Sequence, residues 1–374
     1  MLILAINCGS SSIKCSLIDT DNQRRLFDRQ VDELDGGHAA AMKKMLAGLK
    51  QTGGAQPQAV AHRIVHGGDR FKQPTQVTDD MLASLAELDE LAPLHNPPAV
   101  AAMKVALAAL PSIPHIAIFD TSFHATLPAH AYLYALPSEV RQRYGIRRYG
   151  FHGISHAHVV EELAAHLGKR SDELRIVSCH LGNGASVAAI EHGRSVDTSM
   201  GMTPLEGLVM GTRSGDVDPG VLLHLLRAGR YDAEQLDELL NHRSGMKGLA
   251  GTNDLRDIER RAASGDESCE LAIEIYAYRV RKYIGAYAAA MGGVEAIAFT
   301  GGVGEHSAGV RSRVTERLGF LGVQLDAGLN RNVEVGHDTR IATISSAAST
   351  VTVVVVQADE EMAMAKAAVA VMSA

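Results

Sequence analysis

The stretch that decides the fold is residues 2–19, LILAINCGSSSIKCSLID. Residues 2–7 form a continuous apolar run typical of a buried strand, CGSSS at 8–12 has the composition of a turn, and residues 13–19 alternate as a strand does. The same scheme returns nearly half a chain later, in LRIVSCHLGNGASVAAIEHG at residues 174–193. A hairpin with a glycine-rich turn at the start of each half predicts two related α/β domains.

Helical and strand-like segments alternate along the rest of the chain. Strands are expected at 59–65, 113–119, 294–299 and 351–356, and helices at 38–50, 79–91, 97–110, 221–227, 233–240, 254–263, 267–291 and 358–371. This alternation predicts an α/β protein with mixed sheets. Because no linker rich in proline, serine or glycine separates the halves, the domains are expected to be continuous or to share elements.

Length and composition limit the classes of protein that fit. At 374 residues the chain exceeds the roughly 250–300 residues at which a single core stops growing, so two domains are expected. A content of 46% hydrophobic and 21% charged residues is that of a folded globular protein. The formal net charge of −7 argues against a nucleic-acid partner held by broad electrostatic attraction.

The apolar segments and the cysteines indicate where the protein works. No apolar run reaches the roughly 18–20 residues of a membrane helix, and the apolar start lacks the charged region and cleavage site of a signal peptide. Cys8, Cys15, Cys179 and Cys269 include no Cys-x-x-Cys pair and suit neither a disulfide scaffold nor a thiolate metal site. We therefore expect a cytoplasmic protein with no membrane partner.

Three glycine-rich loops follow apolar strands, at residues 7–12, 182–184 and 301–304. Glycine lets backbone N–H groups approach an anion closely. Neither the P-loop pattern nor the Rossmann pattern occurs in these loops. A tight hairpin would explain one such loop, but three in matching context favour a polyphosphate held between two domains, and hence nucleotide binding.

Two arginines stand in glycine-rich surroundings, Arg63 in HRIVHGGD and Arg213 in GLVMGTRSGDVDPG. A guanidinium fork can hold a carboxylate or a phosphoryl group with two hydrogen bonds. The alternative for either residue is a structural ion pair with a carboxylate. The histidine clusters, in contrast, do not favour zinc, because no H-E-x-x-H pattern occurs.

Eight motifs occur in a fixed order along the chain. They are NCGSSSIK (7–14), HRIVHGG (62–68), APLHNP (92–97), FDTSFH (119–124), RYGFHG (148–153), HLGNG (180–184), VDTSMGMTPLEGLVMGTRSGDVDP (196–219) and FTGGVGE (299–305). This ordered set resembles the acetate kinase family, from Asn7 to the run Asp359-Glu360-Glu361 near the end.

The resemblance implies a fold and a reaction. The fold would be α/β, with duplicated actin-like, RNase H-like ATPase domains as in sugar kinases and the active site in the interdomain cleft. Residues 1–123, completed by a C-terminal helix at 360–374, would form the first domain, and residues 124–359 the second, which would carry most of the nucleotide site. The reaction would be the reversible, direct in-line transfer of the ATP γ-phosphoryl group to acetate, giving acetyl phosphate and ADP. Acetate is already ionised at pH 7, so positioning and charge neutralisation outweigh base catalysis.

The resemblance also implies roles for individual residues. Arg63 and Arg213 would grip the acetate and the phosphoryl group, and His152 would donate a hydrogen bond to that group. Asp120 would orient an arginine or a metal-bound water, a role that we weight above proton transfer. The pocket for the acetate methyl group would be lined by Val65, Leu94, Phe151 and Pro204.

The nucleotide and a metal are assigned in the same way. The residues implied to bind ATP or ADP are Lys14, His180, Leu181, Gly182, Asn183, Gly184, Asp254, Leu255, Arg256, Gly302, Val303, Gly304, Glu305 and His306. Asn7 and Glu360 would hold Mg²⁺, with Mn²⁺ as the alternative metal. His306 stands where the family commonly has asparagine, which leaves the preference for the nucleotide base open.

Several alternatives remain at this point. Val65 is expected to favour acetate over propionate, because it occludes about one methylene, and a propionate kinase of the same family is the alternative. A sugar kinase would need a general base for a hydroxyl acceptor and would not explain the two arginines. A non-catalytic nucleotide switch has no use for a carboxylate clamp. Relatives form homodimers, so a homodimer is expected by analogy.

Overall fold

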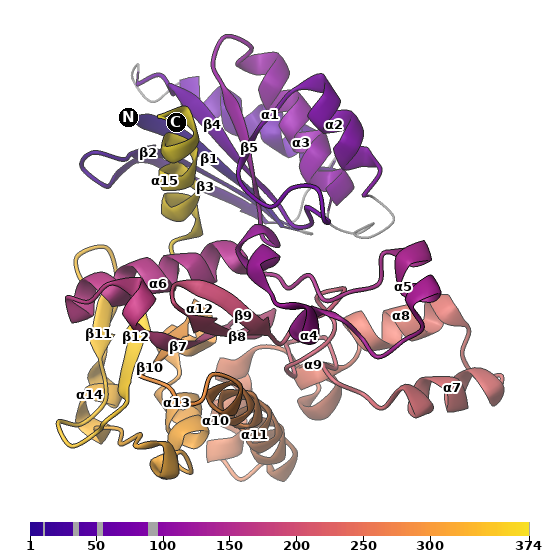
Figure 1. Cartoon of the computed structure of the whole chain (residues 1–374), viewed down its shortest axis with the longest axis vertical. Coiled ribbons are helices and arrows are strands. Elements are labelled where there is room, and N and C mark those ends of the chain that lie inside the picture. Colours follow the sequence, from indigo (N-terminus) through magenta and orange to yellow (C-terminus); the bar gives the residue numbers. More distant parts are fainter. Residues whose placement is uncertain (10–11, 33–36, 51–54, 89–95, 374) are drawn as a thin grey trace. The chain divides into compact units, whose positions relative to one another are not determined.

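The computed structural model describes the chain except for residues 10–11, 33–36, 51–54, 89–95 and 374 (Figure 1). The chain divides into two compact units. The first comprises Met1–Ala125, Phe151–His158 and Asp359–Ala374, and the second comprises Thr126–Gly150 and Val159–Ala358. Each unit is built on one six-stranded sheet.

The sheet of the first unit begins with the hairpin at the N-terminus. The antiparallel strands β1 (Leu2–Cys8) and β2 (Ser12–Asp19) pair along their length, and β3 (Arg24–Asp32) continues the meander. On the other side of β1, β4 (Ala59–Ile64) and then β6 (His115–Phe119) run parallel to it, and the short β5 (Thr75–Gln76) closes the edge antiparallel to β6. The spatial order is β3-β2-β1-β4-β6-β5.

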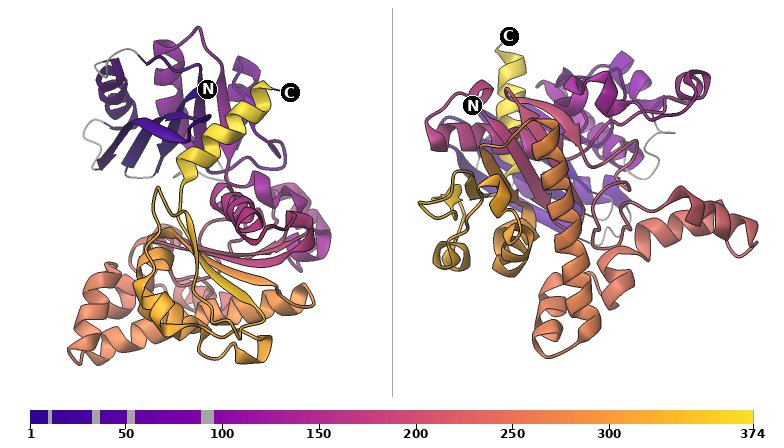
Figure 2. Two further views of the ribbon diagram at one scale, coloured as in Figure 1. Left: turned by 90° about the vertical axis from the view of Figure 1, so that its left-hand side faces the viewer. Right: turned by 60° about the horizontal axis from the view of Figure 1, so that its bottom comes forward.

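Helices cover both faces of this sheet, because the side chains of β1 alternate between two apolar cores. Leu4 and Ile6 enter the core shared with α1 (Gly37–Lys50), α2 (Asp79–Ala86) and α3 (Asn96–Ala109). Ile3 and Ala5 enter the opposite core, which α15 (Glu360–Met372) covers with Met362, Met364, Ala365 and Ala368. Figure 2 shows α15 lying against this sheet, so the last helix of the chain completes the unit that the first strand begins.

The second unit repeats this arrangement. β7 (Arg175–Leu181), β8 (Ala185–Glu191) and β9 (Arg194–Thr198) form an antiparallel meander, β10 (Ala296–Thr300) and β12 (Thr352–Val356) run parallel to β7, and β11 (Ile341–Thr343) closes the edge. The order β9-β8-β7-β10-β12-β11 has the topology of the first sheet, strand for strand in chain order. The predicted duplicated α/β architecture with mixed sheets is therefore confirmed.

Within its described residues, the second unit also contains ten α-helices besides α6. They are α4 (Ala129–Tyr132), α5 (Ser138–Tyr144), α7 (Pro219–Arg227), α8 (Ala233–His242), α9 (Gly245–Ala250), α10 (Leu255–Ala263), α11 (Glu267–Ala290), α12 (Gly301–His306), α13 (Ala308–Thr315) and α14 (Ala327–Asn332). The longest, α11, packs on β7 and β8, and its buried residues include Ile273, Tyr276 and Val280. α6 (Gly153–Leu167) begins in the first unit and continues in the second.

The structure also contains elements that the sequence pattern did not predict. α6 is the largest of them, and β3, β5, β9 and β11 are edge or near-edge strands with weak apolar patterns. α7 begins two residues before its predicted start, because Asp218 caps it and Pro219 occupies its first position. α2 ends at Ala86, earlier than predicted, and the last predicted residues, 89–91, lie outside the described part.

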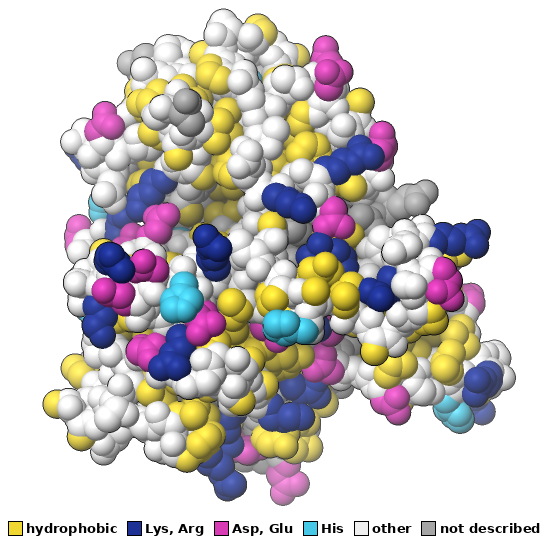
Figure 3. Space-filling model, viewed as in Figure 1, with side chains coloured by type: hydrophobic (Ala, Val, Ile, Leu, Met, Phe, Trp, Pro, Cys, Tyr) yellow, Lys and Arg dark blue, Asp and Glu magenta, His cyan; other side chains and the backbone are white. Residues whose placement is uncertain are grey.

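Surface and helix properties complete the description. None of the described helices combines the length and the apolar character needed to cross a membrane. On the face in Figure 3, Lys and Arg side chains lie among Asp and Glu side chains rather than in one basic patch.

Candidate active site

In the first unit, Arg63 and Asp120 are brought together by two parallel strands. Arg63 lies near the end of β4, and Asp120 follows the last residue of β6. Because these strands are parallel, both residues lie at the carboxyl end of the sheet. Arg63 Nε donates to Asp120 Oδ1 at 2.9 Å and Nη2 donates to Oδ2 at 2.7 Å. Asp120 is only 1% exposed. Arg63 and Asp120 thus form a bidentate ion pair, which fixes the plane of the guanidinium.

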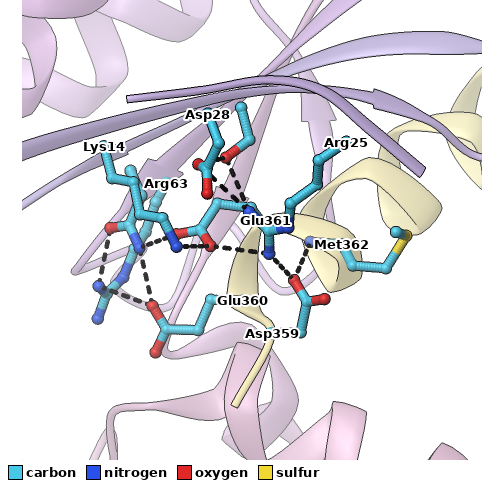
Figure 4. Close-up of polar contacts among 10 residues, drawn as sticks. Lys14, Arg25, Asp28, Arg63, Asp359, Glu360, Glu361 and Met362 are labelled. Atoms are coloured by element: carbon cyan, nitrogen blue, oxygen red, sulfur yellow. Dashed lines mark hydrogen bonds and ion pairs between the residues drawn. The ribbon is translucent and has the colours of Figure 1, made fainter. Parts of the chain in front are cut away.

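Glu360 lies against Nη1, the third nitrogen of the same guanidinium (Figure 4). Asn7 contacts the same nitrogen. Arg63 Nη1 donates to Asn7 Oδ1 at 3.0 Å and stands 3.1 Å from Glu360 Oε2, and Asn7 Nδ2 donates to that Glu360 oxygen at 2.9 Å. Burial alone would lower the pKa of Arg63, but Asp120 and Glu360 outweigh it and hold that pKa above its ordinary value. Arg63 is therefore a permanent cation.

The charges around Asn7 and Glu360 suit a divalent cation. An ion-pair network, called here the α15 charge network, joins the cations Lys14, Arg25 and Arg63 to the carboxylates Asp28, Asp120, Asp359, Glu360 and Glu361. Its formal charge is therefore two negative. The oxygens that a cation would take, Asn7 Oδ1 and Glu360 Oε2, both face Arg63 Nη1 in the described structure. In the described part of the chain, no group of three or more His, Cys, Asp or Glu side chains could hold a metal ion. A cation at Asn7 and Glu360 would thus keep several waters, as Mg²⁺ usually does.

Lys14 points to the same end of α15. Its Nζ donates to Glu361 Oε2 at 2.8 Å, and the lysine side chain is 32% exposed while that of Glu361 is 5% exposed. In the described structure Lys14 is thus paired with a carboxylate of its own unit.

His152 is held in an unusual backbone conformation beside Asp120. Its φ of 56° lies in the left-handed region, which non-glycine residues rarely adopt. The next residue, Gly153, donates its N–H to Asp120 O at 3.0 Å, and a Cβ on Gly153 would stand 2.1 Å from that oxygen. The requirement for glycine at position 153 fixes the start of α6 against the Asp120 backbone, and His152 is the residue that precedes this contact.

The predicted methyl-pocket residues are divided between the units. Val65 follows β4, and Phe151 is 1% exposed in the first unit, where the ring of His66 meets it edge-on with centroids 5.5 Å apart. Two hydrogen bonds between Asn96 and the backbone of His66 fix the loop after Val65. Pro204 belongs to the second unit, and Leu94 lies outside the described residues.

The second unit contains a cavity of about 510 Å³, a size typical of small-molecule sites. It is lined by Gly182, Asn183, Asn253, Asp254, Leu255, Arg256, Glu259, Gly302, Val303, His306 and Ser307. Three segments that are distant in sequence, the β7–β8 turn, the start of α10 and α12, thus meet around one space. Most of the residues predicted to bind the nucleotide belong to this set.

Other residues predicted to bind the nucleotide lie next to the segments that line this cavity. Leu181 is buried at the end of β7, and Glu305 accepts a hydrogen bond from Ala358 N at 3.0 Å. Gly301 has a φ of 77°, and a Cβ there would stand 2.8 Å from Leu181 O, so only glycine allows α12 to begin this close to β7. His180 and Gly184 flank the turn, which Gly182 N closes on Gly184 O at 3.0 Å.

Arg213 has surroundings unlike those of Arg63. It is partly buried, and within the described residues its guanidinium makes no hydrogen bond or ion pair. Burial lowers the pKa of Arg213, because no carboxylate offsets the cost of desolvating the charge. Its backbone oxygen accepts from Met210 N at 3.1 Å, which closes a tight loop around residues 210–213. A desolvated guanidinium without a carboxylate is suited to an external anion.

Comparison with known proteins identifies the family. The model of the acetokinase family matches residues 28–366. The chain belongs to the acetokinase family. It is 46% identical over 394 residues to the acetate kinase of Clavibacter michiganensis subsp. michiganensis (strain NCPPB 382), an alignment that covers 99% of this chain and 98% of the relative.

Solved structures agree with this membership. The acetate kinase of Porphyromonas gingivalis superposes with a TM-score of 0.92 at 39% identity and 99% coverage of both chains. A propionate kinase from Francisella tularensis subsp. tularensis SCHU S4 superposes with a TM-score of 0.89 at 34% identity and 98% coverage of both. The resemblance seen in the eight motifs is therefore confirmed.

Three residues of the cavity were missed by sequence reasoning. Asn253 Nδ2 donates to Asn183 Oδ1 at 3.0 Å, and Ser307 Oγ donates to Glu259 Oε1 at 2.5 Å, so these side chains tie neighbouring walls together. A signal for Glu259 existed, because it lies one helical turn after Leu255 on α10 and therefore on the same face. Asn253 and Ser307 are the residues adjoining predicted segments, and nothing local distinguishes them.

Proposed function

We propose that this chain catalyses the reversible transfer of the γ-phosphoryl group of ATP to acetate, giving acetyl phosphate and ADP. The observation that carries the proposal is the full-length match to relatives named acetate kinase. The features that the reaction needs support the proposal. Arg63 is held by a carboxylate and Arg213 is not, a cavity has the size of a nucleotide site, and Glu360 and Asn7 form a carboxylate–amide pair for a metal. The enzyme class is a phosphotransferase with a carboxyl acceptor.

Acetate needs orientation rather than deprotonation. Its carboxylate oxygen attacks the γ-phosphorus while the bond from that phosphorus to the β-phosphate oxygen breaks, so no proton has to move. Asp120 therefore acts as the residue that orients Arg63. A guanidinium has five N–H groups, and Arg63 uses three of them in the hydrogen bonds to Asp120 and Asn7. Because Nη1 also stands 3.1 Å from Glu360 Oε2, the second N–H of Nη2 is the one left for an anion.

The negative charge that spreads over the transferring group is neutralised by cations and donors. Arg213, which lacks a carboxylate partner in the described structure, would bind the equatorial oxygens, and His152 would donate a hydrogen bond to them. The proposal requires that the groups assigned to acetate and those assigned to ATP meet during turnover.

The nucleotide is assigned to the cavity of the second unit. The glycine-rich turn around Gly182 would accept the phosphates, and the segments 254–256 and 302–306 would hold the ribose and base. The base pocket contains His306 and Glu259, whose side chains can hydrogen-bond to a base edge. Lys14, now paired with Glu361, would exchange that carboxylate for a phosphate oxygen when ATP binds.

We assign Mg²⁺, with Mn²⁺ as a substitute, to Asn7 and Glu360. The net negative charge of the α15 charge network and the two oxygen-bearing side chains support this assignment. A bound divalent ion would neutralise phosphate charge. The contacts of the α15 charge network would hold the Asn7 and Glu360 side chains in place for this ion.

Trapping with hydroxylamine tests the reaction. Purified protein is given ATP, Mg²⁺ and acetate, and any acyl phosphate becomes a coloured hydroxamate, while ADP release is measured in parallel. We expect hydroxamate that depends on both acetate and ATP. ADP release without hydroxamate would overturn the proposal and favour a nucleotide switch, and acceptance of a sugar hydroxyl in place of acetate would favour a sugar kinase.

Propionate is the second candidate acceptor, because a propionate kinase is among the structural relatives. The same assay with propionate in place of acetate separates the two. We expect the higher kcat/KM with acetate, because Val65 takes up the space of about one methylene.

We also propose a cytoplasmic homodimer. All four cysteines are free and buried, which suits a reducing compartment. α7 has no buried residue and exposes Val221, Leu223 and Leu226, which supports association with another surface. Light scattering after size-exclusion chromatography measures the assembly, and a monomeric mass would contradict the homodimer.

A further inference from the structure

Arg25 joins the β2–β3 hairpin to the first turn of α15, although neither the motifs nor the proposed reaction gives it a role. Its Nη2 forms a short ion pair with Asp359 and stands 3.5 Å from Glu361 Oε2 (Figure 4). Its Nη1 donates to Ser16 Oγ at 2.9 Å and stands 3.5 Å from Asp28 Oδ1. The arginine side chain is 20% exposed, against 8% for Asp359 and 5% for Glu361. One guanidinium thus serves two buried carboxylates.

Asp359 is the cap of α15. Its Oδ1 accepts the N–H of Met362 at 3.0 Å, and the same oxygen is the one that Arg25 contacts. Arg25 therefore holds the cap that decides where α15 begins.

Glu361 is fixed from three strands. Its Oε1 accepts from Asn7 Nδ2 at 3.0 Å, and its Oε2 accepts from Lys14 Nζ at 2.8 Å and faces Arg25. Asn7, Lys14 and Arg25 lie on β1, β2 and β3, respectively. The second carboxylate of α15 is thus anchored across half of the sheet.

Glu360 lies between these two anchored residues. Successive residues of a helix diverge by about 100° around its axis, so clamping Asp359 and Glu361 fixes the direction in which the Glu360 side chain leaves the helix. That direction is toward Asn7 Nδ2 at 2.9 Å and Arg63 Nη1 at 3.1 Å. The position of the Glu360 carboxylate therefore depends on the contacts of its two neighbours as well as on its own contacts with Asn7 and Arg63.

We propose that Arg25 is a positioning residue for the metal-binding carboxylate of this enzyme. By clamping Asp359 and Glu361, it holds Glu360 beside Asn7, so that the two side chains assigned to the divalent cation stay together. The inference rests on the proposed function only in taking Asn7 and Glu360 as the metal site. Residues that orient metal ligands typically change metal affinity by about 10–100-fold when they are removed.

The test compares Arg25→Ala, Arg25→Lys and the control Arg24→Ala. Arg24 is exposed on the same strand and is outside the α15 charge network, so its replacement removes the same charge without the clamp. Mn²⁺ binding is measured by water proton relaxation, with and without ADP, and the Mg²⁺ concentration that gives half-maximal rate is measured with acetate and ATP. The midpoint of thermal unfolding is recorded for each variant.

We expect Arg25→Ala to weaken Mn²⁺ binding and to raise the half-saturating Mg²⁺ concentration about tenfold or more, with the KM for acetate unchanged. Arg25→Lys retains the charge but cannot reach Ser16 and Asp359 together, so it should lie between the wild type and Arg25→Ala. If Arg25→Ala does not fold, Arg25→Lys carries the comparison. Metal affinity equal to that of Arg24→Ala, with a lowered unfolding midpoint only, would overturn the proposal and leave Arg25 a structural tie.

The two proposals fail in different ways. A wild-type chain that forms no hydroxamate but binds Mn²⁺ in a manner dependent on Arg25 refutes the proposed reaction and supports the positioning role. If the wild-type chain forms hydroxamate but Arg25→Ala and Arg24→Ala give the same metal measurements, the proposed reaction is supported and the positioning role of Arg25 is refuted. A wild-type chain that binds no Mn²⁺ with or without ADP overturns the positioning role.

Discussion

Both carboxylate oxygens of Asp120 accept hydrogen bonds from the guanidinium of Arg63, at 2.9 Å from Nε and 2.7 Å from Nη2. The arrangement leaves the outer edge of the guanidinium to Asn7 and Glu360. A carboxylate engaged in this way can fix the plane of the guanidinium, which is the orienting role that we propose for Asp120.

Asp120→Asn should separate orientation from charge. The amide keeps the shape but offers Arg63 one acceptor in place of two, so the guanidinium loses its fixed plane. We expect kcat to fall about 100-fold, because misplacing a reacting group has an effect of that order. Initial rates in the hydroxamate assay measure this, and Asp79→Asn, an exposed change in α2, is the control. Activity near that of the control would contradict the orienting role.

Arg63→Ala and Arg213→Ala should both abolish most activity but should differ in stability. Removing Arg63 leaves Asp120 and Glu360 without their cation, at a cost of about 3–5 kcal/mol in the free energy of unfolding. Removing Arg213 orphans no carboxylate in the described structure, so the free energy of unfolding should stay the same or rise.

Urea unfolding and steady-state rates together check this pair of variants. For Arg213→Ala we expect kcat to be lowered by orders of magnitude with ATP affinity retained, because the cavity in the second unit does not include it. A kcat like that of the wild type would refute its role in the transition state. Equal destabilisation by both substitutions would show that Arg213 has a carboxylate partner.

Val65→Ala should change the choice of acceptor. Removing the two methyl groups opens space for a longer chain, so kcat/KM for propionate relative to acetate should rise by about 10-fold or more. Val100→Ala, a partly buried change in α3, keeps the ratio if the effect is local. An unchanged ratio in Val65→Ala would refute the assignment of the methyl pocket.

The stability of the first unit should fall in acid because of His62. Its Nε2 lies 2.9 Å from His115 Nδ1, and it is 2% exposed on β4. Burial, and to a lesser degree His115, hold the pKa of His62 well below its usual range. The folded chain keeps His62 neutral while the unfolded chain binds a proton below about pH 6.5, so stability is complete above that pH and is lost below it.

The loss should approach 1.4 kcal/mol per pH unit for this histidine, as an order-of-magnitude figure. Unfolding free energies between pH 7 and pH 5 measure it. His62→Gln should reduce the slope, whereas His224→Gln, an exposed change in α7, should retain it. Equal slopes in all three proteins would contradict the assignment.

Local sequence patterns predicted much of the fold. The repeated hairpin gave β1–β2 and β7–β8 because continuous apolar runs broken by glycine turns need no tertiary information to recognise. The sequence pattern did not predict α6, because its sequence, GISHAHVVEELAAHL, has scattered apolar residues and three histidines. The edge strands β3, β5, β9 and β11 were not predicted, because pairing with a neighbouring strand, rather than their own composition, makes them strands.

By itself, the sequence determined which side chains were available and that the two halves were related. Only the tertiary structure decided which side chains meet. Asn7 and Glu360 are 353 residues apart, yet their side chains hydrogen-bond, because β1 is central in the sheet and α15 returns to cover it. Arg63 and Arg213 look alike in the sequence, but Arg63 is paired with two carboxylates, whereas Arg213 is desolvated and has no carboxylate partner among the described residues. Burial and partnership set the chemistry of a guanidinium, and both depend on strand pairing that no local pattern specifies.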